Sequence, residues 1–258
     1  VANGILKFVR ATNPTGTTWG APVTLNSPAT TGHYNSMNIV NGNPAIAFYD
    51  STKFDLIYVR SADAIGTIWN AAVAVDTIGS VGKFCSLQIV SGNPAISYYD
   101  ATALDLKYVR ASNANGTTWG TPVSVDVTGS VGQYTSLEVV NGNPAIAYYD
   151  ATALDLKYVR ANDATGTTWG TPVSVDVTGS VGTYTSLKVI NGNPAITYRD
   201  ATNLSLKYVR ATNASGTAWG APIALDVTAA VGQFNSLQIV NGNPAVSYFA
   251  GTDLVFGI

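Results

Sequence analysis

A period of 50 residues runs through almost the whole 258-residue chain and limits the folds that it can adopt. Tryptophan occurs at only five positions, and a Gly-Asn-Pro-Ala turn recurs with the same spacing. The positions are Trp19, Trp69, Trp119, Trp169 and Trp219 for the tryptophans, and Gly42, Gly92, Gly142, Gly192 and Gly242 for the turns. A strict period of this length indicates stacked copies of one supersecondary unit.

Each unit predicts four antiparallel strands separated by turns. In the third copy the expected strands are Tyr134–Val140, Pro144–Tyr149, Leu156–Ala161 and Thr168–Val175. Asn141-Gly142-Asn143 is a hairpin signal, and the loop Asp150–Asp155 separates the second strand from the third. Four strands in a period near 50 residues are typical of a blade of a β-propeller.

The two ends of the chain predict how the ring closes. Residues Ile5–Ala11 and Trp19–Leu25 match a third and a fourth strand, whereas Phe234–Val240 and Pro244–Phe249 match a first and a second. We therefore expect an all-β, five-bladed propeller whose terminal strands share one blade, with residues 1–258 as a single domain. The tail Asp253–Ile258 resembles another third strand, and the sequence leaves open which copy occupies the blade.

Composition excludes some partners and says little about others. A formal net charge of −2 and a pI near 5.2 give no field for a phosphate backbone, so we expect no nucleic-acid partner. No run of 18 apolar residues exists, and the first residues resemble neither a start nor a signal, which predicts a soluble, mature or excised segment without a membrane span. The abundance of Thr, Asn, Ser, Ala and Gly favours an extracellular or cell-surface location. A single cysteine, Cys85, excludes an intramolecular disulfide.

The turn between the third and fourth strands resembles a known motif. Ser112-Asn-Ala-Asn-Gly116-Thr-Thr-Trp119 is similar to the Asp-box of sialidase-like propellers, Ser-x-Asp-x-Gly-x-Thr-Trp. Here the acidic or amide residue precedes the glycine by three positions, where the Asp-box has two. These residues are Asn13, Asp63, Asn113, Asp163 and Asn213. In that family the box is structural, so the resemblance implies fold and no chemistry. The five-bladed architecture is also similar, at the level of fold, to that of tachylectin-type lectins.

The acidic residues argue against catalysis. Glycoside hydrolysis needs two carboxylates in different environments. Glu138 is the only glutamate, and nearly every aspartate recurs from unit to unit. Arginines on the third strands recur in the same way, which prevents a single converging triad, and His33 lacks the context of a catalytic triad. From these patterns we expect no enzyme, no cofactor and no metal site, with Asx-turns as the role of the loop aspartates.

A different set of residues predicts repeated ligand sites. Aromatic rings beside carboxylates suit a sugar, whose C–H faces stack on the ring while its hydroxyls bond to polar groups. Such groups meet where the first strand begins and the second ends, on the face opposite the Asp-box-like turns. The candidate residues are Tyr49, Asp50, Tyr99, Asp100, Tyr149, Asp150, Asp200, Tyr34, Phe84, Tyr134, Tyr184 and Gln133. The alternative is that these tyrosines pack between blades.

These observations favour a non-catalytic binding module, multivalent and lectin-like or adhesive, with glycans or a cell-surface partner as its ligands. The alternatives are a structural scaffold without a small ligand and, more remotely, a sialidase-like glycosidase. The oligomeric state is left open. Strand alternation also predicts that five residues of the first strands face a central channel, with Glu138 close enough to interact with Lys188. They are Asn38, Gln88, Glu138, Lys188 and Gln238.

Overall fold

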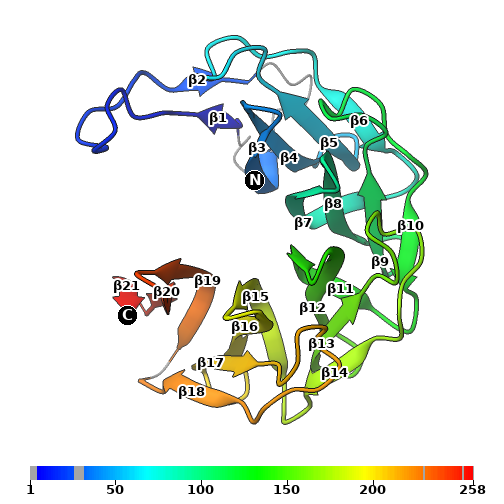
Figure 1. Cartoon of the computed structure of the whole chain (residues 1–258), viewed down its shortest axis with the longest axis vertical. Coiled ribbons are helices and arrows are strands. Elements are labelled where there is room, and N and C mark those ends of the chain that lie inside the picture. The colour runs from blue at the N-terminus through cyan, green and yellow to red at the C-terminus, as the bar shows by residue number, and fades with distance from the viewer. Residues whose placement is uncertain (1–4, 26–31, 229, 252, 258) are drawn as a thin grey trace.

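The protein is described by a computed structural model that covers residues 5–25, 32–228, 230–251 and 253–257. Within these ranges every regular element is a β-strand. None of these residues belongs to a helix long and apolar enough to span a bilayer. Figure 1 shows the sheets arranged one after another along an open arc, each twisted against the next.

Four sheets have four antiparallel strands each, in the order of the sequence. The first contains β3 (Gly32–Val40), β4 (Asn43–Asp50), β5 (Asp55–Arg60) and β6 (Val73–Asp76), and the second contains β7 (Val81–Val90), β8 (Asn93–Asp100), β9 (Asp105–Arg110) and β10 (Val123–Asp126). The third contains β11 (Val131–Val140), β12 (Asn143–Asp150), β13 (Asp155–Arg160) and β14 (Val173–Asp176). The fourth contains β15 (Val181–Ile190), β16 (Asn193–Asp200), β17 (Ser205–Arg210) and β18 (Ile223–Asp226).

Two smaller sheets lie at the ends of the arc. The strands β1 (Lys7–Phe8) and β2 (Val23–Thr24) form a pair, and β19 (Val231–Val240), β20 (Asn243–Ala250) and β21 (Asp253–Gly257) form a three-stranded sheet. The tail therefore occupies the third-strand position of the last sheet. Because β1–β2 and β19–β21 are separate sheets, this arrangement does not confirm the expected blade shared by both termini.

The expected strands are present, with different limits for the first and the fourth. The turn Asn141-Gly142 has φ values of 46° and 82°, as a two-residue hairpin of type I′ requires. The first strand starts at Val131, three residues earlier than expected. The fourth starts only at Val173, because Trp169 belongs to the preceding turn and forms an isolated bridge with Ala161.

Tryptophan packs between neighbouring sheets rather than inside one. The ring of Trp119 lies 5.2 Å from that of Tyr58, edge to face, and its indole donates to the carbonyl of Gly116 over 2.9 Å. A Cβ on Gly116 would come within 2.6 Å of the Tyr58 ring, so this close approach requires glycine. The same arrangement recurs in the pairs Tyr108–Trp169, Tyr158–Trp219 and Phe8–Trp69.

Buried polar contacts also join neighbouring sheets. The hydroxyl of Tyr148 donates to Asp126 Oδ2 over 2.6 Å, and both residues are buried. Lys157 Nζ lies 2.7 Å from Asp150 Oδ2 and 3.6 Å from Asp126 Oδ2. Each buried carboxylate thus has a donor, which offsets the cost of its desolvation.

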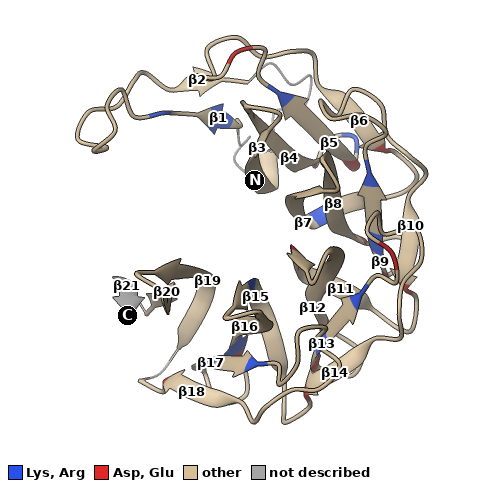
Figure 2. Cartoon of the chain, viewed as in Figure 1, with Lys and Arg blue, Asp and Glu red and all other residues tan. Residues whose placement is uncertain are grey.

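The arginine at the end of each third strand has a structural role. Arg160 Nε donates to the carbonyl of Val140 over 2.8 Å, and equivalent bonds are made by Arg60, Arg110 and Arg210. Figure 2 shows charged residues recurring from sheet to sheet along the arc. These arginines therefore bind the end of the first strand of their own sheet.

Candidate functional site

The first strand of each sheet lies on the inner side of the arc (Figure 1), and we call β3, β7, β11, β15 and β19 the axial strands. Side chains link each axial strand to the next. The hydroxyl of Thr135 donates to the carbonyl of Phe84 over 2.8 Å, and the amide of Leu137 donates to Ser86 Oγ over 3.0 Å. These bonds replace a backbone ladder between strands of different sheets and hold the axial strands side by side.

A chain of polar side chains runs across four axial strands. Asn38 Nδ2 donates to Gln88 Oε1 over 3.1 Å, and Gln88 Nε2 donates to Glu138 Oε1 over 3.0 Å. Lys188 Nζ lies 2.9 Å from Glu138 Oε2. The predicted contact of Glu138 with Lys188 is confirmed, as is the convergence of these four residues. Gln238 continues the same position on β19.

Aromatic residues form a second row along the axial strands. Their centroids lie 4.4 Å apart for Tyr34–Phe84 and Phe84–Tyr134, 4.6 Å for Tyr134–Tyr184 and 4.8 Å for Tyr184–Phe234. Together with the residue after each of them, they line a pocket of about 270 Å³. We call these five aromatic residues the aromatic collar. Four of them are among the site residues predicted from the sequence. Phe234 is not, although its place in the repeat was visible.

The collar is built on a strained backbone. Its members have φ values of 50–55°, which bulky side chains rarely adopt. At Tyr134 the pairing of β11 with β12 shifts register between Gln133 and Ser136, which marks a β-bulge. Bulges re-aim side chains, and strain repeated at one position is a reason to look for function there. Burial, together with the nearby Tyr184 hydroxyl, raises the pKa of Tyr134 to about 12, so its phenol is neutral.

The Tyr-Asp part of the predicted site is occupied by internal contacts. The Tyr149 hydroxyl bonds to Ser180 Oγ over 3.1 Å. Asp150 Oδ1 accepts from the amides of Thr152 and Ala153, both over 2.9 Å, which is the expected Asx-turn. Equivalent contacts hold the other members of this set, which are Tyr49, Asp50, Tyr99, Asp100 and, for the aspartate alone, Asp200.

These tyrosines support the collar from behind. The ring of Tyr149 lies 6.4 Å from that of Tyr134, and Tyr49 and Tyr99 lie at similar distances from Tyr34 and Phe84. Gln133 is half-buried opposite Tyr149. A direct role of the Tyr-Asp set in ligand binding stays a prediction.

One position next to the collar breaks the repeat. Arg199 replaces the tyrosine found at Tyr149, and its guanidinium acts electrostatically on the phenol of Tyr134. Arg199 Nε and the hydroxyl of Thr183 are buried with no hydrogen-bond partner among the described residues, and the two residues are paired across β15 and β16. An orphaned donor and an orphaned hydroxyl at one place suit a ligand with oxygen acceptors.

The single thiol takes no part in this chemistry. Cys85 is buried, its Sγ donates to the carbonyl of Tyr34, and burial raises its pKa to about 12. A thiol with a raised pKa is a poor nucleophile. Cys85 therefore fills the place of Thr135 and Thr185 in the axial contacts.

No protein-family model matches the sequence, and no curated protein matches it in sequence. The structure is similar to an exo-β-1,3-galactanase from Phanerochaete chrysosporium with galactose, at a TM-score of 0.59 and 12% identity, covering 94% of this chain and 60% of that one. It is similar to a Hadza microbial sialidase at a TM-score of 0.58 and 13% identity, covering 85% and 53%. A thermostable family-43 glycoside hydrolase gives a TM-score of 0.54 and 11% identity, covering 90% and 95%.

These similarities contradict the expectation of a non-catalytic, lectin-like module that is no enzyme. The galactanase, the sialidase and the family-43 protein are all glycosidases by name, which favours the glycosidase alternative. That expectation rested on the recurrence of the aspartates and on Glu138 as the only glutamate. At such low identity the likeness establishes the fold: the chain is an all-β protein of repeated four-stranded sheets with Asp-box-like turns, consistent with a sialidase-like propeller.

Proposed function

We propose that this protein is a glycosidase-type propeller that binds a saccharide at the aromatic collar and uses Glu138 as a carboxylate of the reaction. One observation carries the proposal: Glu138, the only glutamate, and the aromatic collar with its strained backbone belong to the same axial strands. Apolar faces with a few convergent polar groups are what a sugar pocket needs. A volume of about 270 Å³ suits a single sugar ring at the collar better than a long chain.

The spacing along the axial strand places the two groups at different depths. Glu138 is four positions after Tyr134, which at about 3.3 Å per residue places their Cα atoms at most roughly 13 Å apart. A substrate therefore stacks one sugar on the collar and extends along the channel toward Glu138. The Lys188 ammonium lies 2.9 Å from Glu138 Oε2 and holds this side chain in place on the axial strands. In the proposed reaction Glu138 serves as the general base or the nucleophile.

A single axial carboxylate leaves one catalytic role to another group. Among the described residues of the axial strands, Glu138 is the only acidic side chain. Where one carboxylate is missing, glycosidases use a tyrosine or a group of the substrate in its place. The collar supplies tyrosine hydroxyls, and Arg199 supplies a cation beside them. We therefore expect the substrate to carry an anionic or amide group.

Hydrolysis of a panel of aryl glycosides and oligosaccharides, with neutral, acidic and N-acetylated terminal sugars, tests this function. The matched variant is Glu138→Gln, because glutamine stands at the same position in Gln88 and Gln238. We expect the wild-type protein to release product and the variant to lose at least 100-fold in rate while it keeps its melting temperature. No release from any substrate, or an unchanged rate in the variant, would contradict the proposal.

The collar has a separate test. Tyr134→Ala should weaken saccharide binding roughly tenfold, since it removes one stacking face. Tyr134→Phe is the control, and it should retain affinity, because position 84 of the collar already holds phenylalanine. Calorimetry on Glu138→Gln protein would measure binding without turnover.

We also propose that residues 1–258 form one domain of five blades. Four complete sheets and two partial ones, with a constant period, support this count. Extracellular or cell-surface placement and a cell-surface partner stay predictions from composition.

A further inference from the structure

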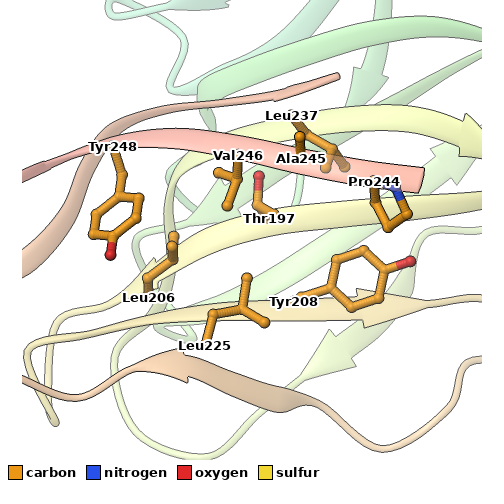
Figure 3. Close-up of a pocket in the computed structure, with 9 residues that line it drawn as sticks. All are labelled: Thr197, Leu206, Tyr208, Leu225, Leu237, Pro244, Ala245, Val246 and Tyr248. Atoms are coloured by element: carbon orange, nitrogen blue, oxygen red, sulfur yellow. The ribbon is translucent and has the colours of Figure 1, made fainter. Parts of the chain in front are cut away.

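The last complete sheet has a packing site that lacks its usual partner. Tyr58, Tyr108 and Tyr158 are each buried under the tryptophan of the next sheet. Tyr208 holds the same position on β17, but no tryptophan among the described residues packs on it, since Trp219 of its own sheet packs on Tyr158. It lines a pocket of about 360 Å³ instead (Figure 3).

The pocket is apolar and lies between β17–β18 and β20. Figure 3 shows Tyr208 and Tyr248 at opposite ends, with Leu206, Leu225 and Val246 between them. Leu225 is 46% exposed. An open apolar pocket next to an unpaired aromatic ring indicates a docking site.

The other end of the arc carries the group that is missing here. Trp19 is 61% exposed, whereas Trp69, Trp119, Trp169 and Trp219 are half-buried against an aromatic ring. Met37 on β3 is 56% exposed, although Leu87, Leu137 and Leu187 at the same position are buried. The side chains of β1–β3 that would face a preceding sheet are therefore open to solvent.

The hairpin β1–β2 already has the geometry of the outer half of a blade. Lys7 pairs with Thr24 and Phe8 with Val23, as Lys157 pairs with Ser174 and Tyr158 with Val173. Phe8 packs against Trp69 as each tyrosine packs against the next tryptophan. The hairpin corresponds to a third and a fourth strand, and it lacks a first and a second. Strands β19 and β20 are a first and a second strand without outer strands of their own repeat.

The tail holds the edge that the hairpin would need. Ala250 pairs with Asp253 and Tyr248 with Val255, in the register of Asp150 with Asp155 and Tyr148 with Lys157. By the period, β1 would pair with β20 in the same register, with Ile5 opposite Ala250. Strands β1 and β21 therefore compete for one edge of β20.

We infer that residues 5–25 of the same chain dock on β20 in place of β21, insert Trp19 into the Tyr208 pocket and close the ring. The repeat predicts the contacts. The Tyr158 hydroxyl donates to the carbonyl of Ser215, 57 positions later in the chain. In a closed ring with the same period, the equivalent bond would join Tyr208 to the carbonyl of Thr15. Lys207 Nζ lies 3.1 Å from Asp176 Oδ2. The equivalent ion pair in the closed ring would join Lys7 to Asp226. Strand β21 caps the β20 edge in the open arc, which protects it from pairing with other chains.

Closure also completes the collar. Each aromatic residue from Tyr34 to Phe234 contacts the next, but Phe234, which is 69% exposed, has no aromatic neighbour on its far side among the described residues. Docking of the hairpin would bring β19 beside β3, and with it Phe234 beside Tyr34. The inference itself rests on the repeat geometry and does not depend on the proposed glycosidase activity.

Two cysteine pairs distinguish the closed ring from the open arc. In the full chain with Cys85→Thr, the pair Ile5→Cys and Ala250→Cys reports the docked hairpin. The pair Ala250→Cys and Asp253→Cys reports the tail. Directly opposed residues of antiparallel strands lie within reach of a disulfide. Oxidation of dilute protein, followed by non-reducing electrophoresis and peptide mapping, measures each yield.

We expect the first pair to form a disulfide within the monomer. Comparable yields in both pairs would also support the exchange, because one edge would then hold either strand in turn. A first pair that stays reduced while the second is oxidised would overturn the inference. So would a first pair that is oxidised only between two chains, since the hairpin would then dock on a second copy. Activity plays no part in this measurement, so its failure is separate from failure of the proposed function.

Discussion

Tyr158 and Tyr208 occupy the same position in neighbouring sheets and have the same sequence around them, yet their surroundings differ. Tyr158 is buried under Trp219 and donates to a carbonyl of the next sheet. Tyr208 lines an open pocket. The difference arises from the neighbour on the C-terminal side, because each sheet supplies only part of its own core and the next sheet supplies the rest. An interior interface and a terminal interface can therefore be compared residue by residue.

Removal of tryptophan should show the largest difference between the two regions. Trp119→Ala deletes an interior contact and should lower the free energy of unfolding by about 3 kcal/mol. In the open arc Trp19→Ala should cost almost nothing, because that side chain is 61% exposed. In the closed ring it should cost about as much as Trp119→Ala.

Chemical denaturation of the two variants and the wild type measures these values. Trp69→Ala serves as a further control, because its partner Phe8 belongs to the hairpin itself. If Trp19→Ala proves neutral, hairpin docking in solution would lose its support.

Loss of a buried tyrosine hydroxyl gives a smaller difference. Tyr148→Phe leaves the buried carboxylate of Asp126 without its 2.6 Å donor and should destabilise the protein by about 1–3 kcal/mol. Tyr248→Phe should cost less, since Asp226 is more exposed and also accepts from the hydroxyl of Thr228 over 2.5 Å.

Thermal unfolding of the two phenylalanine variants tests this order. Docking of the hairpin would bring Lys7 to Asp226 and raise the cost of Tyr248→Phe toward that of Tyr148→Phe. Equal losses in a protein that lacks residues 5–25 would contradict this explanation.

The repeat alone was sufficient to predict the sheets, because period, turn residues and strand alternation all report local structure. The same alternation placed Glu138 beside Lys188 on the axis. It could not show that Tyr134 sits on a bulge with positive φ, because the repeat allowed a regular strand there. Nor could it show that Lys157 lies between Asp150 of its own sheet and Asp126 of the neighbouring one, since the second contact depends on packing between sheets.

Function was harder to predict than fold for a physical reason. Symmetry in the sequence suggested that repeated polar residues share one role, which favoured several repeated ligand sites over a single catalytic one. The axis of a ring is one place shared by all units. A single unrepeated residue such as Glu138 or Arg199 is enough to make that place chemically distinct.

The smallest expected difference concerns the Asp-box-like turns, in which an interior aspartate can be compared with a terminal asparagine. Burial acts to raise the pKa of Asp163, but hydrogen bonds from Thr165, Thr167 and Thr168 outweigh it and hold that pKa well below the usual range. The folded state therefore binds its proton less readily than the unfolded chain. The resulting stabilisation is present above about pH 4 and is lost as pH falls toward the lowered pKa. Asp163 is half-buried in a surface turn, where solvent screens its charge, so we expect the effect to stay below about 1 kcal/mol.

The reciprocal variants Asp163→Asn and Asn13→Asp test this effect in both regions. Asn13 already bonds to the amide of Thr17 over 3.1 Å and to its hydroxyl over 2.7 Å, so the terminal turn has the geometry to receive a carboxylate. Relative to wild type, Asp163→Asn should be less stable at pH 7 and equally stable near pH 2. Asn13→Asp should gain stability at pH 7 and lose that gain on acidification. Melting temperatures between pH 2 and pH 7 measure both curves. Asn13→Asp could leave the melting temperatures unchanged while Asp163→Asn removes their fall at low pH. The terminal turn would then not be held tightly enough to bind a carboxylate, and hairpin docking would have to hold it in place.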